Sequence, residues 1–138
     1  MTVQMNPYLN FKGDAKAAME LYNDIFGGDL TLNTFGDFAS EEHPADPADA
    51  DKVMHARLSA PGGFELMASD VPQGMEASPN GTISLSGDDA EKLRSYWDRL
   101  SDGGNVVMPL EKQMWGDDFG MLVDRFGVSW MVDIAPAG

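Results

Sequence analysis

Two neighbouring apolar segments carry side chains that could perform acid–base or ion-pairing chemistry. His55 and Arg57 lie two residues apart in segment 53–60, and Glu65 precedes Met67 in segment 64–69. If both segments are strands, each pair shares one face, because strand side chains alternate with period two. An imidazole titrates near neutral pH and could act as a general acid or base, and a guanidinium could receive an anionic group.

Each of these residues also has a purely structural interpretation. His55 could be a hydrogen-bonded core histidine, and Arg57 could form a bridge with Glu65 or Asp70. The sequence contains neither a Ser-His-Asp order nor a phosphate-binding loop. His55 is therefore a tentative catalytic residue, with its structural role as the alternative.

The same alternation, applied to the other predicted strands, separates polar faces from apolar ones. In segment 82–86, Ile83 and Leu85 face one way, and small polar side chains face the other. The apolar face should pack on a helix, which leaves the polar face toward a cavity suited to a small molecule. The predicted ligand-binding residues are Tyr8, Asn10, Arg57, Glu65, Met67, Ser69, Thr82, Ser84, Trp115 and Met131. Trp115 is a stacking lid in this interpretation, or else a dimer contact or core residue.

Hydrophobic periodicity predicts the elements that position these side chains. Asp14 and Asp88 should cap two helices, each of which ends at a Gly-Gly pair. Helical spacing predicts two buried faces, one of Ala15, Ala18, Met19, Tyr22, Ile25 and Phe26, and the other of Leu93, Tyr96, Trp97 and Leu100. The predicted strands are 5–11, 30–35, 53–60, 64–69, 82–86, 105–109 and two within 115–131.

The two halves of the chain repeat one unit. Gly13-Asp14 and Gly87-Asp88 are each followed, at identical offsets, by a Tyr and an Asp, and Gly63–Met67 aligns with Gly127–Met131. We predict an α+β fold of two βαβββ modules, 1–70 and 81–138, joined by a linker, 71–80. Because one module cannot cover both faces of its sheet, the two modules should pack as a pair.

Composition excludes several kinds of partner. The net charge of −14 disfavours nucleic acid and anionic membrane surfaces, and no apolar run is long enough to span a membrane. The chain has no Cys and no recognisable signal peptide, so we expect a cytoplasmic protein. Residues 37–51 hold six acidic residues, no basic one and His43, which predicts a mobile loop that could act as a lid or have no role.

The order of these pieces resembles the vicinal oxygen chelate superfamily, which includes glyoxalase I, extradiol dioxygenases and the bleomycin and fosfomycin resistance proteins. Segments 6–13, 21–28, 54–58, 66–70 and 115–131 are similar to its PhnB-like branch. The resemblance implies a curved mixed sheet of eight strands around a cavity, often completed by homodimerisation. Some members of this branch are labelled as demethylubiquinone methyltransferases, but we find no glycine-rich site for a methyl donor here.

The resemblance also implies where a metal would lie. Glyoxalase-type members hold a divalent metal with side chains from the first and last strands of each module. These positions fall at Tyr8 (or Pro7 if the strand is shifted by one), Thr82, Met67 and Met131. Zinc, iron, nickel and manganese sites of this kind require imidazole and carboxylate, which these residues do not offer. Two thioethers would suit copper(I), but they are more often packing.

A metal site built from neighbouring residues would also be incomplete. Glu65 and His55 supply one ligand each from the same half, and His43 could add a third only from the acidic loop. We therefore predict no metal and no cofactor.

Three functions remain as hypotheses. The favoured one is a metal-free, homodimeric protein that binds or sequesters a small molecule. The second is a metal-dependent lyase, isomerase or dioxygenase. The third is a metal-free enzyme in which His55 is the acid or base and Tyr8 or Arg57 polarises a carbonyl.

Overall fold

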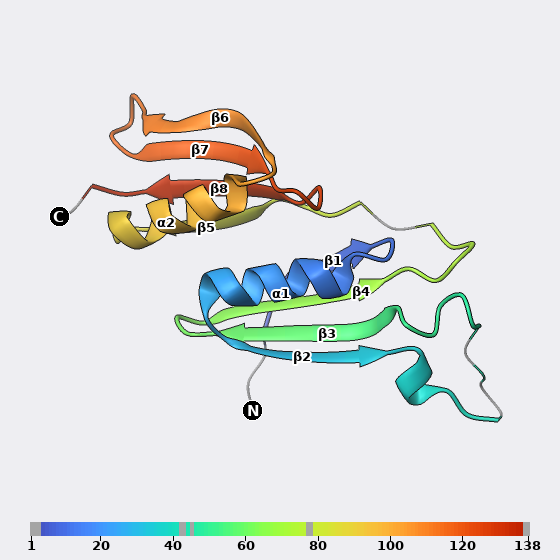
Figure 1. The fold of residues 1–138 in the computed structure, drawn as a ribbon. Helices are drawn as coiled ribbons and strands as arrows, with labels where there is room; N and C mark the ends of the chain where they lie inside the picture. The colour runs from blue at the N-terminus through green and yellow to red at the C-terminus, as the bar shows by residue number, and fades with distance from the viewer. Residues whose placement is uncertain (1–3, 42–43, 45, 77–78, 137–138) are drawn as a thin grey trace. The chain divides into compact units, whose positions relative to one another are not determined.

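The computed structural model describes residues 4–41, 44, 46–76 and 79–136, which fall into two compact units, Met1–Asn80 and Gly81–Gly138 (Figure 1). Unit 1 contains β1 (Tyr8–Phe11), α1 (Ala15–Phe26), β2 (Asp29–Thr34), a short 3-10 helix η1 (Gly36–Phe38), β3 (Val53–Ala60) and β4 (Phe64–Asp70). Unit 2 contains β5 (Ile83–Gly87), α2 (Ala90–Ser101), β6 (Asn105–Lys112), β7 (Asp118–Val123) and β8 (Ser129–Ile134).

The two units share one topology. Unit 1 forms a four-stranded sheet in the order β1-β4-β3-β2, and unit 2 forms one in the order β5-β8-β7-β6. The first strand of each unit pairs in parallel with the last, and the other pairs are antiparallel. The predicted α+β fold of two βαβββ modules is therefore confirmed, as two mixed sheets with one helix each.

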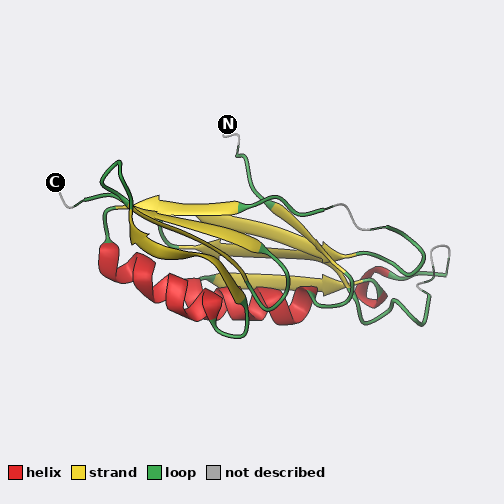
Figure 2. Cartoon of the chain, turned by 90° about the horizontal axis from the view of Figure 1, so that it is seen from above, coloured by secondary structure: helices red, strands yellow, loops and turns green. Residues whose placement is uncertain are grey.

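In each unit the helix lies along one face of its own sheet (Figure 2). The buried residues of α1 and α2 are the two sets that helical spacing predicts. The strands supply the facing layer through alternate residues, such as Leu9 and Phe11 in β1 and Trp130 and Val132 in β8. The remaining residues of each strand lie on the opposite face, which we call the open face of that unit because its helix does not cover it.

The Gly-Gly pair after each helix has two separate functions. Gly27 adopts φ 70° and donates its N–H to the Asn23 carbonyl at 2.8 Å, which closes the last turn of α1. A Cβ on Gly28 would lie 2.2 Å from the carbonyl oxygen of Ser59. A Cβ on Gly104 would likewise lie 2.4 Å from the carbonyl oxygen of Val123. The second glycine therefore lets the next strand start against the backbone of its neighbour.

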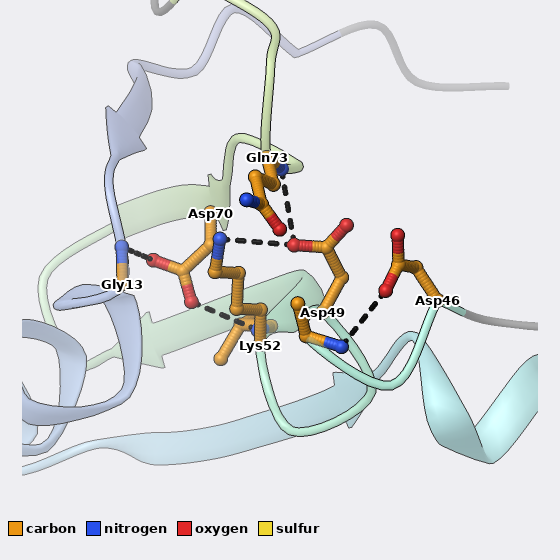
Figure 3. A network of polar contacts seen from close by, with 8 residues as sticks. Gly13, Asp46, Asp49, Lys52, Asp70 and Gln73 are labelled. Atoms are coloured by element: carbon orange, nitrogen blue, oxygen red, sulfur yellow. Dashed lines mark hydrogen bonds and ion pairs between the residues drawn. The ribbon is translucent and has the colours of Figure 1, made fainter.

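Both predicted helix caps are wrong in detail. Asp14 precedes α1 but makes no capping hydrogen bond with its side chain. The buried carboxylate of Asp70 instead accepts the N–H groups of Gly13 and Ala15 on Oδ1, at 2.9 and 3.0 Å, and that of Val53 on Oδ2, at 2.9 Å (Figure 3). In unit 2, Asp89 rather than Asp88 caps α2, by accepting from Lys92 N–H at 3.1 Å.

Part of the acidic loop is tied to the end of β4. Asp49 is 8% exposed, forms an ion pair with Lys52 at 2.9 Å and accepts the Gln73 N–H at 3.0 Å (Figure 3). The hydrogen bond from Lys52 and then that from Gln73 lower the pKa of Asp49, so this carboxylate is charged at neutral pH. The hydrogen bond with Gln73 joins the loop to the segment that follows β4. His43 lies outside the described residues.

Several predicted strand ends differ from the structure. β1 begins at Tyr8 rather than residue 5, and β5 begins at Ile83, so the prediction that Thr82 is a strand residue is wrong. β6 continues past Pro109 to Lys112, with register shifts between Met108 and Glu111 that accommodate a residue without an N–H. Within the described residues, no helix has the length and apolar character needed to cross a membrane.

Candidate functional site

The open face of unit 1 brings together seven of the predicted site residues. They come from three adjacent strands, because β4 lies between β1 and β3. Their neighbours in sequence, such as Leu9, Ala56 and Leu66, are buried on the helix side. The seven residues are Tyr8, Asn10, His55, Arg57, Glu65, Met67 and Ser69.

Strand register arranges these side chains in rows. Tyr8 and Arg57 both pair with Met67, one from each side. The adjacent row pairs Asn10 with Ser69, and the row on the other side pairs Ser59 with Glu65. Paired residues on neighbouring strands have side chains close enough to contact one ligand.

An aromatic pair spans β4, with Tyr8 on β1 and His55 on β3. The rings of Tyr8 and His55 are stacked, with centroids 6.3 Å apart and an interplanar angle of 29°. Tyr8 is 45% exposed, and His55 is half-buried. A phenol and an imidazole in this arrangement bring two aromatic rings and their hydrogen-bonding groups close together.

Arg57 is held by Glu65. Its Nε donates to Oε2 of Glu65 at 3.0 Å, and the Ser59 hydroxyl lies 2.9 and 3.0 Å from the two carboxylate oxygens. The hydrogen bond from Arg57, followed by that from Ser59, lowers the pKa of Glu65. The structural bridge to Glu65 is therefore present, whereas Asp70 bonds to backbone N–H groups instead.

One side of the Arg57 guanidinium is turned away from Glu65. Nη2 of Arg57 donates to Oε1 of Gln4 at 3.5 Å, the outer limit for such a bond. Sequence reasoning missed both Gln4 and Ser59. Alternation gives the signal for Ser59, which lies two residues after Arg57 on the same face.

The free edge of β1 is closed by a side chain. Oδ1 of Asn80 accepts the Asn10 N–H at 2.7 Å, and Nδ2 of Asn80 donates to the Asn10 carbonyl at 3.1 Å. An amide side chain thus takes the place of a neighbouring strand at the edge of the sheet. Asn10 is consequently fixed through its backbone, while its side chain belongs to the open face.

The other predicted ligand-binding residues belong to unit 2. Thr82 is exposed just before β5, and Ser84 pairs with Met131 across β5 and β8. Trp115 is 62% exposed in the loop between β6 and β7, with its ring 6.1 Å from that of Phe119 in an edge-on arrangement. Hydrogen bonds from Gln113 N–H to the Asp117 carbonyl and from Gly116 N–H to the Gln113 carbonyl close this loop.

Two carboxyl groups meet beside that loop. Asp133 of β8 is hydrogen bonded to Asp117, and its Oδ1 is inaccessible and has no protein partner among the described residues. The hydrogen bond that protonated Asp133 donates to Asp117, together with burial and charge repulsion, raises the pKa of Asp133. Turn formation, the role predicted for Asp117 and Asp118, is therefore only part of what they do. Asp117 pairs with Asp133, and Asp118 forms an ion pair with Arg94.

Asp133→Asn is expected to stabilise the protein above pH 7. A raised pKa means that the folded state binds the proton of Asp133 more tightly than the unfolded state does. Protonated Asp133 therefore stabilises the wild-type fold fully below the unfolded-state pKa, and this contribution is lost as the pH rises through the folded-state pKa. An asparagine keeps a donor for Asp117 and cannot ionise. The urea midpoint should rise at pH 8, and the gain should shrink toward pH 4. Equal midpoints for wild type and variant at pH 8 would contradict the raised pKa of Asp133. The control is Asp98→Asn, on the exposed side of α2.

The donor set does not fit a glyoxalase-type metal. The four positions implied by the resemblance offer a phenol, a hydroxyl and two thioethers. Glu65, which shares a strand face with Met67, already binds Arg57 and Ser59. Among the residues that the structure describes, no three His, Cys, Asp or Glu lie together as a metal site would require.

An open hollow of about 660 Å³ lies elsewhere in unit 1, on the acidic loop rather than on the sheet. Its walls are mostly small and apolar: Gly36, Ala39, Ser40, Glu41, Pro44, Pro47 and Ala50. None of the predicted ligand-binding residues lines it. The open face and this hollow are therefore separate features of unit 1.

Comparison with known proteins gives consistent matches. A sequence model of the Glyoxalase/Bleomycin resistance protein/Dioxygenase superfamily matches residues 4–132. The crystal structure of protein PA1353 from Pseudomonas aeruginosa is 41% identical, with a TM-score of 0.84 over 99% of this chain and 100% of that one. A Bacillus cereus structure described as a putative 3-demethylubiquinone-9 3-methyltransferase, PhnB protein, is 25% identical, with a TM-score of 0.73 over 96% and 100%. Protein YjdN of Escherichia coli is 26% identical over 94% of each chain.

Proposed function

Because the chain belongs to the glyoxalase/bleomycin resistance protein/dioxygenase superfamily, we propose that it binds a small planar molecule on the open face of unit 1 without a metal. The observation that carries this proposal is the stacked Tyr8–His55 pair beside Arg57 on a face that α1 leaves uncovered. Binding or sequestration, rather than a defined reaction, is the function that these contacts support.

The contacts favour an aromatic or conjugated ligand with an oxygen substituent. A flat ligand can pack on the rings of Tyr8 and His55, where aromatic contacts contribute about 0.5–1.5 kcal/mol beyond area burial. Its oxygen can replace the Gln4 amide at Nη2 of Arg57, because the contact with Gln4 is long. Glu65 meanwhile keeps the guanidinium in place. Met67, between Tyr8 and Arg57, supplies a polarisable floor.

A thermal-shift screen tests this proposal. Aromatic carboxylates, phenols and conjugated hydroxy-ketones are the probes, and a ligand present at 100 times its Kd should stabilise the fold by about 2.7 kcal/mol. Tyr8→Ala and His55→Ala should each weaken the best ligand about tenfold, because each removes one ring of the stacked pair.

The matched control is Lys16→Ala, on the exposed side of α1, which should bind as the wild type does. Full ligand stabilisation in both ring variants would place the site elsewhere. Loss of stabilisation in the presence of a chelator would instead favour a metal-dependent lyase, isomerase or dioxygenase.

A metal-free enzyme is the second candidate, and the contact between Tyr8 and His55 favours it. In this version His55 moves a proton while Tyr8 or Arg57 polarises a carbonyl of the bound molecule. His55→Gln should then abolish turnover of any screened ligand that is consumed, while its binding persists. Turnover retained in His55→Gln would leave binding as the function of this face.

The proposal includes a homodimer that acts in the cytoplasm. Val106 and Val107 are 43% and 59% exposed on β6, the edge strand of the unit 2 sheet. Apolar side chains on an exposed edge strand favour association with another chain. Light scattering after gel filtration should give twice the mass of the 15.0 kDa chain, and the monomer mass would contradict this part of the proposal.

A further inference from the structure

Three methionines form one row across the open face of unit 2. Met121 of β7 pairs with Met131 of β8 on one side and with Met108 of β6 on the other. Gly120 and Leu122 flank Met121 and are buried toward α2, as are Trp130 and Val132 on either side of Met131. The three side chains therefore lie together on the face that α2 leaves uncovered.

These methionines are not core residues of unit 2. Met108 is 41% exposed, and Met121 and Met131 are half-buried. The chain contains ten Met and no Cys, and within the described residues Met19 is the single methionine of the buried core. Most of the described methionines are thus half-buried or exposed.

The spacing of the row permits a shared ligand. Directly paired residues on adjacent strands have Cβ atoms roughly 4.5–5.5 Å apart, and a methionine side chain has three rotatable bonds. The side chains of both outer methionines can therefore lean toward that of Met121, the middle member. Register shifts on both sides of Met108 bend β6 at this point.

We propose that the thioethers of Met108, Met121 and Met131 form a site for a soft monovalent cation, Cu(I). Thioether sulfur selects Cu(I) over hard cations, which require oxygen ligands, and over zinc, which prefers thiolate, imidazole or carboxylate. Phe119, two residues before Met121, places an apolar ring on the same face of β7. The net charge of −14 attracts cations to the protein as a whole.

An anaerobic titration tests this site. Cu(I) is added to the 138-residue chain in competition with a chromophoric Cu(I) chelator, and Ag(I) is titrated calorimetrically as a redox-inert probe. We expect one equivalent of each ion to bind, at least tenfold more weakly in Met121→Leu and Met131→Leu. Leucine conserves volume and is tolerated in packed surfaces, so these variants should fold.

Methionines outside the row provide matched controls. Met75 and Met114 are 63% and 100% exposed, and Met75→Leu and Met114→Leu should bind as the wild type does. Absence of competition by the wild-type protein would overturn the proposal. Wild-type affinity in Met121→Leu and Met131→Leu would also overturn it, as would a loss in Met114→Leu equal to theirs. Because Tyr8→Ala leaves this row intact, failure of the unit 1 proposal would not change these results.

Discussion

Asp70→Ala is expected to lower the free energy of unfolding by about 3–5 kcal/mol, a large part of the stability of a typical domain. The substitution leaves the N–H groups of Gly13, Ala15 and Val53 without their acceptor. Asp70 is 3% exposed, so water cannot readily replace the carboxylate. The loss reaches three elements at once, because these N–H groups belong to the turn after β1, the first turn of α1 and the start of β3. A urea titration followed by circular dichroism measures it.

Asp70→Asn separates the contributions of the two oxygens. An amide oxygen can replace Oδ1, but the amide nitrogen then faces the N–H of Val53 and cannot accept it. We expect a loss smaller than that of Asp70→Ala but still measurable. Asp51→Ala, at an exposed position of the acidic loop, should change stability by about 0.5 kcal/mol or less. An Asp70→Ala midpoint equal to that of Asp51→Ala would show that Asp70 does not organise unit 1.

Gly28→Ala should destabilise unit 1 by about 3 kcal/mol or more, or prevent its folding. The new Cβ would lie 2.2 Å from the Ser59 carbonyl oxygen and 2.7 Å from the Cα of Ala60. Both are backbone atoms, so relief requires β2 to move away from β3. Movement of β3 would also displace the face that carries His55 and Arg57.

Two further glycines make this prediction specific. A Cβ on Gly81 would meet no atom within 4 Å, so Gly81→Ala should leave the urea midpoint unchanged or slightly raised. Gly104→Ala should reproduce the effect of Gly28→Ala in unit 2, because its Cβ would lie 2.4 Å from the Val123 carbonyl. Wild-type stability in Gly28→Ala would contradict the close approach of β2 and β3.

The sequence predicts the fold well because two independent patterns agree. Apolar spacing defines the buried faces of both helices, and the internal repeat fixes the order of elements within each unit. The Gly-Gly pairs mark both helix ends, because one glycine adopts positive φ and the next avoids a clash. The comparisons confirm the predicted superfamily, and a PhnB protein is among the similar structures.

The caps could not be predicted from local sequence. An Asp in front of a helix is the usual cap, yet the first turn of α1 is capped by Asp70, which is distant in sequence and reaches it only once β4 has paired with β1. In unit 2, backbone angles determine whether Asp88 or Asp89 caps α2, and the amino-acid sequence does not reveal these angles. Tertiary pairing therefore decides which carboxylate satisfies the exposed N–H groups.

The sequence predicts which residues of the candidate site share a sheet face, but not which of them contact one another. Alternation places Tyr8, His55 and Arg57 on one side of their strands, and the register then determines which of them meet. The pairing of Asp117 with Asp133 and the row through Met108 depend on the loop after β6 and on the register shifts within that strand. Neither has a local sequence signal.

The central claim is that the open face of unit 1 binds a planar molecule without a metal. Calorimetric titration of the strongest screened ligand into chelator-treated wild-type protein and into chelator-treated Tyr8→Ala tests it most directly. The account predicts that the wild type keeps its full affinity after chelation and that Tyr8→Ala binds about tenfold more weakly. Loss of wild-type affinity on chelation, or equal affinity in the two proteins, would contradict it.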